Sequence, residues 1–357
     1  MTDILAPFAY LLGKPVAQAK LKSQAEDFQV IEDLGFEFSG DGEHLMVRIR
    51  KQGENTTFVA NEIARLCGVP SKNVGWAGLK DRHAVTEQWL SVHLPKPDMS
   101  FDAKALEQQY PSIKVLDTAR HNKKLRPGDL VGNQFVIRLV DVTDINDVIE
   151  RLEKIKQSGV PNYYGSQRFG RDGNNLAEAR RWGRDNVRTR NQNKRSMYLS
   201  TARSWIFNHI LSHRIENGLF NQLIEGDIVK NEQSAQNPQG ELLTVEADTL
   251  ESLQSQLEQG SVFLTSALAG DNALPTQGLA QQLENQFLDA EEDLMKLIRG
   301  NRMRHDRRVV GLKADNMNWQ VDGSDVVVSF SLPAGCFATS ILREVADAVE
   351  VERVYES

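Results

Sequence analysis

Residues 75–89 have the sequence GWAGLKDRHAVTEQW, which places one carboxylate among basic side chains on a turn. Asp81 lies directly between Lys80 and Arg82, and the glycines before it are typical of a turn. Apolar residues alternate along the following segment, 89–94, which predicts a half-buried strand. Because nearby cations favour the ionised form of an aspartate, Asp81 is a candidate nucleophile.

Asp81 also has a purely structural interpretation. An aspartate in a turn commonly accepts a main-chain N–H group from a residue two positions later. The cations around it can equally bind a phosphate backbone. If Asp81 is the nucleophile, the segment indicates an enzyme that acts on nucleic acid.

The composition indicates a globular protein with two domains, or with one domain that carries a large insertion. The chain has 357 residues, of which 40% are hydrophobic and 25% charged. Its two cysteines, Cys67 and Cys336, exclude a disulfide framework, and no cysteine or histidine cluster predicts a metal site. Residues 1–10 lack signal-peptide character, and no apolar run is long enough to span a membrane. We therefore expect a soluble, cytoplasmic protein.

The charge of the chain is unevenly distributed. The formal net charge is −7, yet residues 161–205 hold ten basic and three acidic side chains. A second basic cluster consists of Arg299, Arg302, Arg304, Arg307 and Arg308. A run of arginines is often only a solvated helix face, but two such clusters in an acidic chain favour a polyanionic ligand.

The pattern of elements predicts an outer α/β part and a helical middle. Strands are expected over 44–50, 135–142 and 325–332. A helix capped by Thr56 or Thr57 is expected to end at Gly68. Further helices are expected over 145–157, 201–224 and 279–302, and over 341–349 with Ser340 as its cap. The two outer parts are expected to join into one domain, with the basic middle as an insertion. Neither a phosphate-binding loop nor a dinucleotide fingerprint is present in the sequence.

Five groups of short motifs, in order along the chain, resemble the TruD family of tRNA pseudouridine synthases. They are Lys22-Ser23 with Glu26-Asp27-Phe28; Gly78-Leu79-Lys80-Asp81 with Trp89; Arg126-Pro127-Gly128-Asp129 with Gly132-Asn133-Gln134-Phe135; Pro161-Asn162-Tyr163-Tyr164-Gly165 with Gln167-Arg168-Phe169-Gly170; and Leu332-Pro333-Ala334-Gly335 with Phe337-Ala338-Thr339-Ser340 and Arg343-Glu344. Each motif is weak alone, but their order is specific.

The resemblance implies an α/β (α+β) fold. The catalytic domain is expected to contain a curved, mostly antiparallel sheet, and an inserted α/β TRUD module is expected to form a V-shaped cleft with it. In this sequence the domains correspond to residues 1–155 and 309–357 for the catalytic domain and 156–308 for the arginine-rich insertion, which would hold tRNA. We expect a monomer.

The resemblance also implies isomerisation of uridine 13 in the D arm of tRNA to pseudouridine, without a metal or organic cofactor. Asp81 corresponds to the catalytic aspartate, which attacks the uracil ring or the ribose, or assists a glycal route. Positions that line the uridine pocket are Phe28, Asn133, Phe135 and Phe337.

Two lysines and two rival functions complete the expectations from the sequence. Lys80 would keep Asp81 ionised or contact phosphate, and Lys22 is a further phosphate candidate. A non-catalytic tRNA-binding or folding protein is the alternative function. An RNA methyltransferase would need a glycine-rich donor loop, which the sequence lacks.

Overall fold

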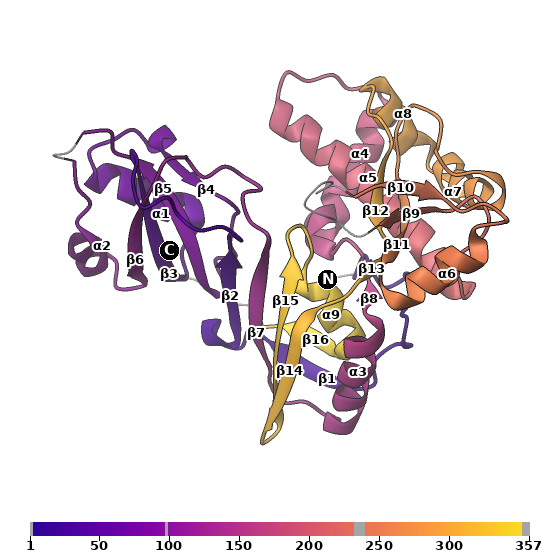
Figure 1. Ribbon diagram of the computed structural model, residues 1–357, viewed down its shortest axis with the longest axis horizontal. Helices are drawn as coiled ribbons and strands as arrows, with labels where there is room; N and C mark the ends of the chain where they lie inside the picture. Colours follow the sequence, from indigo (N-terminus) through magenta and orange to yellow (C-terminus); the bar gives the residue numbers. More distant parts are fainter. Residues whose placement is uncertain (1–2, 97–98, 232–239, 352–357) are drawn as a thin grey trace. The chain divides into compact units, whose positions relative to one another are not determined.

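The computed structural model describes residues 3–96, 99–231 and 240–351, and the chain divides into two compact units (Figure 1). We call the first the sheet unit; it consists of Pro15–Lys156, Ala314–Ala338 and the chain from Val345 onward. We call the second the helical unit; it consists of the chain up to Lys14, Gln157–Lys313 and Thr339–Glu344. None of the helices in the described ranges has the length and apolar character of a membrane span.

The sheet unit is built on eight strands. They are β2 (Phe28–Asp33), β3 (His44–Gln52), β4 (Val74–Trp76), β5 (Val85–His93), β6 (Ile113–His121), β7 (Gly132–Leu139), β14 (Asp315–Asp322) and β15 (Asp325–Pro333). Their order is β14-β15-β7-β2-β5-β3-β6, and β4 pairs with β5 off this path. Among the described strands of this sheet, only β2 and β5 run parallel to each other. The expected α/β class with a mostly antiparallel sheet is therefore confirmed.

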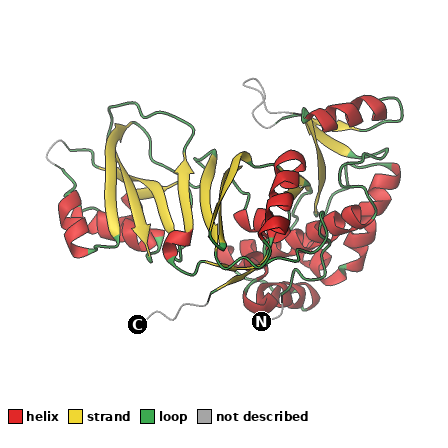
Figure 2. Ribbon diagram, turned by 90° about the horizontal axis from the view of Figure 1, so that it is seen from below, coloured by secondary structure: helices red, strands yellow, loops and turns green. Residues whose placement is uncertain are grey.

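The register brings polar and aromatic residues to one face of this sheet. Directly paired residues point to the same face, so Glu32 of β2 faces the same side as Asn133 of β7, and Val30 the same side as Phe135. On the same face of β3 and β5, an apolar cluster packs under α1 (Thr56–Leu66) and α2 (Ala103–Gln109). At the left of Figure 2, red helices of this unit lie beside its yellow strands.

A parallel strand pair, β1 (Gln18–Leu21) and β16 (Asp347–Glu350), completes the sheet unit together with α3 (Ile145–Ser158). Leu21 pairs with Glu350, so the residue after β1 and the end of β16 come together. The expectation of a helix through residue 349 is wrong. The N–H of Asp347 instead donates to the carbonyl oxygen of Ala17 at 2.8 Å, because β1 offers an open edge.

The helical unit contains a four-stranded sheet, short strands and long helices. They are β8 (Val160–Pro161), α4 (Asn174–Arg184), α5 (Gln192–Glu216), β9 (Ile228–Asn231), β10 (Leu242–Thr244), α6 (Leu250–Gln259), β11 (Val262–Leu268), α7 (Gly278–Ala290), α8 (Glu292–Gly300), β12 (Asp306–Val309), β13 (Gly311–Leu312) and α9 (Ala338–Val345). The sheet order is β10-β9-β11-β12. The single helix expected over 279–302 is two helices, interrupted at Glu291, whose carboxylate accepts hydrogen bonds from Arg180 and Trp205.

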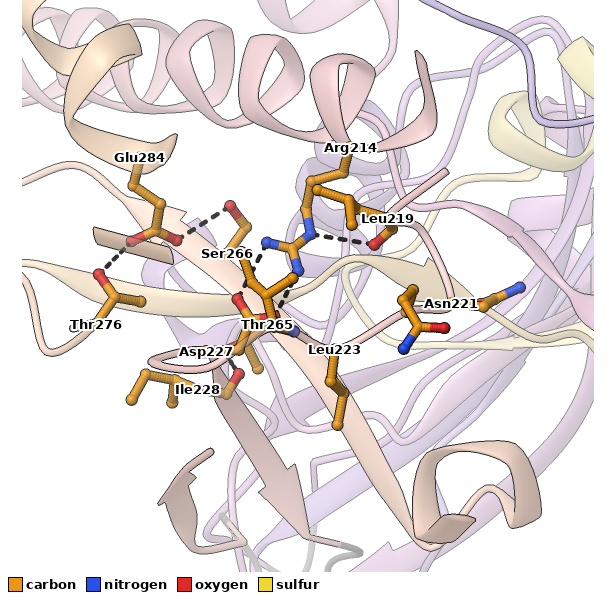
Figure 3. A network of polar contacts seen from close by, with 12 residues as sticks. Arg214, Leu219, Asn221, Leu223, Asp227, Ile228, Thr265, Ser266, Thr276 and Glu284 are labelled. Carbon is orange, nitrogen blue, oxygen red and sulfur yellow. Dashed lines mark hydrogen bonds and ion pairs between the residues drawn. The ribbon is translucent and has the colours of Figure 1, made fainter. Parts of the chain in front are cut away.

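Buried charges fix the core of the helical unit (Figure 3). Arg214 of α5 forms a two-pronged ion pair with Asp227 at 3.0 and 2.6 Å, and both side chains are 1% exposed. Glu284 of α7 accepts hydrogen bonds from the hydroxyl of Thr276 and from the guanidinium of Arg307. Arg307, which the sequence placed in a ligand-binding cluster, is thus a buried structural residue.

The two units differ from the expected domain division at three short segments. The chain up to Lys14, residues 309–313 and residues 339–344 belong to the same unit as the middle of the chain. The guanidinium of Arg343 donates to the carbonyl oxygens of Leu5 and Phe8, and the carboxylate of Glu344 accepts the main-chain N–H of Leu11 at 2.9 Å. These hydrogen bonds join the N-terminal segment to residues 339–344. Ser340 lies inside α9 and does not cap it; its hydroxyl donates to the carbonyl of Tyr163.

Candidate active site

The loop between β4 and β5, residues 77–84, is held by a network of side chains beneath it. The hydroxyl of Thr56 accepts the N–H of Lys80 at 3.1 Å and donates to the amide of Gln88 at 2.8 Å. Gln88 in turn donates to the carbonyl of Gly78 at 3.1 Å. Thr56, expected as a helix cap, is instead the first residue of α1, and its hydroxyl serves this loop.

Asp81 uses both carboxylate oxygens. Oδ1 accepts the main-chain N–H of His83 at 2.8 Å, which is the structural contact expected of an aspartate in a turn. Oδ2 accepts a hydrogen bond from the ammonium of Lys22 at 2.6 Å. Burial acts to raise the pKa of Asp81, but the bonds from Lys22 and His83 outweigh it, and the pKa is lowered. The carboxylate is therefore ionised at neutral pH and remains 30% exposed.

Lys22 is the cation that serves Asp81. It follows β1 in a left-handed conformation, φ 55°, which turns its side chain out of the strand direction. Its ammonium also contacts Glu350 at 3.0 Å and lies 4.8 Å from the ring centre of Phe28. Burial acts to lower the pKa of Lys22, but its hydrogen bond to Asp81 and the other carboxylate contacts raise it overall. A side chain that is 7% exposed and shared by two carboxylates differs from the phosphate contact expected for Lys22.

Lys80 points away from the carboxylate of its neighbour Asp81. Its ammonium donates to Oδ1 of Asn133 at 2.5 Å and lies 3.1 Å from the carboxylate of Glu32. Glu32 also accepts the main-chain N–H of Trp89 at 3.0 Å. Burial raises the pKa of Glu32 in spite of the Lys80 ammonium. Lys80 therefore orients the amide of Asn133.

Three phenylalanines line the sheet face beside these polar groups. The rings of Phe28 and Phe135 meet edge to face with 6.2 Å between their centres. Phe330 of β15 stacks on Phe135 at 5.5 Å. Phe337 lies in the turn after β15, is 42% exposed, and is not part of these ring contacts. The structure thus groups Phe28, Phe135 and Asn133 on one face and leaves Phe337 outside the ring cluster.

Four residues of the site escaped the sequence analysis: Glu32, Lys51, Phe330 and Glu350. The alternation of apolar residues along β3 and β15 carries a signal for Lys51 and Phe330. Continued from Val47 and Ile49, the inward pattern reaches Lys51, a charge at a core position. The ammonium of Lys51 donates to the main-chain oxygen of Asp81 at 3.1 Å.

The comparisons with known proteins show the family and agree with the fold. A family model described as tRNA pseudouridine synthase D (TruD) matches residues 7–179 and 174–345. The chain belongs to the TruD family. The tRNA pseudouridine synthase D of Vibrio parahaemolyticus is 65% identical over 355 residues, 99% of this chain and 100% of that protein. The relative from Vibrio cholerae strain O395 is 61% identical over 356 residues, 100% of this chain and 96% of that protein.

A crystal structure described as that of the putative tRNA pseudouridine synthase D (TruD) from Methanosarcina mazei has the same fold. It superposes with a TM-score of 0.74 at 23% identity and covers 96% of each chain. The two chains therefore share a fold across a large sequence distance.

The basic residues of this TruD chain divide into structural and exposed groups. Arg308 lies 4.2 Å from the ring centre of Tyr164 and donates to Asn162, and Arg307 is buried beside Glu284. The side chain of Arg171, by contrast, is 81% exposed, and Arg190 is also exposed. Only part of each basic cluster is therefore available to a polyanion.

Proposed function

We propose that this protein isomerises uridine 13 in the D arm of tRNA to pseudouridine, with Asp81 as the catalytic nucleophile. The observation that carries the proposal is the Asp81 carboxylate, kept ionised by Lys22 and partly open to solvent. A nucleophilic or basic carboxylate must be ionised to act, and the contact with Lys22 favours that state.

The residues beside Asp81 suit a uracil taken out of the RNA stack. An enzyme that acts on a base extrudes it into a pocket with apolar walls and polar groups for its edge. Phe28 and Phe135 offer the apolar walls, and Asn133, oriented by Lys80, offers an amide to the edge of the uracil. Because uridine and pseudouridine are isomers, the reaction consumes no group donor and no oxidant.

The reaction requires three events in one pocket. The bond between nitrogen 1 of uracil and the ribose breaks, the detached base turns, and carbon 5 bonds to the ribose. Carbon 5 then loses its proton and nitrogen 1 takes up a proton, so the product is an isomer of uridine. Asp81 attacks the uracil ring or the ribose anomeric carbon, or assists formation of a glycal. Each route needs an ionised carboxylate next to the uridine. The apolar walls hold the base during its rotation and limit access of water.

The test is pseudouridine mapping on tRNA from cells that lack the protein. We expect one D-arm pseudouridine to disappear, to return with the wild-type gene, and to stay absent with Asp81→Asn. The Asp81→Asn protein is expected to bind tRNA still. If tRNA binds but its pseudouridine content never depends on the protein, the non-catalytic RNA-binding alternative holds instead.

A further inference from the structure

Lys51 is a buried cation without a carboxylate partner in the described part of the chain. The residue is 0% exposed, and its ammonium donates a hydrogen bond to the main-chain oxygen of Asp81. Opposite it on β5, the hydroxyl of Thr86 is fully buried and has no partner among the described residues. Burying an ammonium without an ion pair costs folding free energy, so a structural role is a poor explanation for this lysine.

The electrostatics around Lys51 agree with this cost. The pKa of Lys51 is lowered from 10.5 to about 8. Burial is the main cause and Lys80 contributes, while Asp81 and Glu54 act in the opposite direction. An apolar side chain of similar length would fill the same space without that cost. The position of the ammonium therefore has to be explained by what it contacts, which is the backbone of Asp81.

We infer that Lys51 is a positioning residue for the reaction at Asp81, retained at the expense of fold stability. This inference rests on the proposed function. Lys51 holds the carbonyl of Asp81 from below, while Thr56 holds the N–H of Lys80 and, through Gln88, the carbonyl of Gly78. With the backbone held on both sides, the Asp81 carboxylate keeps one direction relative to Lys22.

A purely structural role and a positioning role of Lys51 make opposite predictions for Lys51→Met. A residue that only supports the fold loses stability and activity together when it is replaced. A positioning residue that is costly to bury loses activity while the protein becomes more stable. We expect kcat on tRNA to fall about 100-fold, with KM changed less than about threefold, because a small displacement of a reacting group has an effect of that size.

The experiment measures kcat, KM and the thermal midpoint at pH 7 for wild type, Lys51→Met and the control Lys104→Met. Lys104 is an exposed lysine of α2. The inference expects a raised midpoint with reduced kcat for Lys51→Met, and no change for the control. An unchanged kcat, or a lowered midpoint in a folded variant, overturns it.

A second variant keeps the test decisive if Lys51→Met does not fold. Thr56→Val removes the hydroxyl that holds the N–H of Lys80, and it is expected to reduce kcat with little change in KM. An unchanged kcat in Thr56→Val then overturns the inference. If wild-type protein forms no pseudouridine, the proposed function fails and the inference fails with it; an active wild type with an equally active Lys51 variant refutes the inference alone.

Discussion

The ammonium of Lys22 lies 2.6 Å from Oδ2 of Asp81, although 59 residues separate them in the chain. Lys80, the immediate neighbour of Asp81, turns instead to Asn133 and Glu32. The charge state of Asp81 therefore depends on Lys22, which follows β1. The orientation of the Asn133 amide depends on Lys80, which lies in the loop between β4 and β5. This division assigns a separate task to each lysine.

Replacing Lys22 is expected to shift the acidic side of the pH–rate profile. In Lys22→Met the pKa of Asp81 is no longer lowered by the ammonium, and burial raises it. Because the reaction needs the ionised carboxylate, activity should decline at a higher pH than in wild type. Tritium release from tRNA labelled at uridine carbon 5, measured from pH 4 to 8, reports this shift.

Lys20→Met is the matched control for this prediction. Lys20 is on the same strand, and its side chain is 58% exposed in an ion pair with Asp141 at 2.6 Å. Its replacement should leave the profile in place. If Lys22→Met retains the wild-type acidic limb, the contact with Lys22 does not set the charge of Asp81.

Replacing Lys80 is expected to destabilise the sheet unit through Glu32. The side chain of Glu32 is 0% exposed, so Lys80→Met leaves a buried carboxylate without its ammonium. Breaking such a pair on one side costs about 3–5 kcal/mol. The added change Glu32→Gln removes the charge and should restore part of the stability. Urea unfolding of the two single variants and the double variant measures this coupling, and a double variant no more stable than Lys80→Met contradicts it.

Local patterns in the sequence predict local structure well in this protein. The strand expected over 44–50 is β3, and the helix expected after a cap at Thr56 or Thr57 is α1, because the alternation and spacing of apolar residues depend on nearby positions alone. Asp81 was found in the same way, by the turn around it. The inward position of Lys51 also follows from the alternation of apolar residues, once the strand expected over 44–50 is extended to residue 51.

Long-range partners are what the sequence does not reveal. Nothing near Lys22 indicates that it meets Asp81, and a run of arginines does not show that Arg307 faces Glu284. Residues 347–350 have a helix-like pattern but form β16, since strand formation depends on the available edge of β1. Tertiary contacts of this kind decide which charges are paired and which are exposed.

The burial of Lys51 predicts a pH dependence of stability. Its pKa is about 8 in the folded protein, below the ordinary value of 10.5, so the unfolded chain binds more protons between these values. The cost of burial, about 3 kcal/mol, is present in full below pH 8 and disappears as the pH rises to about 10.5. The stability advantage of Lys51→Met over wild type should therefore be large at pH 7 and smaller at pH 9.5 in urea unfolding. An advantage independent of pH would contradict this account.

Exposed arginines of the helical unit are expected to contribute to tRNA binding by neutralising phosphates. Replacing both Arg171 and Arg190 by Gln should weaken tRNA binding and make its salt dependence shallower, by about 0.7–0.9 in the slope of log affinity against log salt for each phosphate that is no longer neutralised. Filter binding between 50 and 200 mM salt measures both effects. Lys154→Gln, on α3 in an ion pair with Glu150, is the control and should leave the slope unchanged. If the double variant keeps the wild-type slope, these arginines are solvated side chains and other cations bind the phosphates.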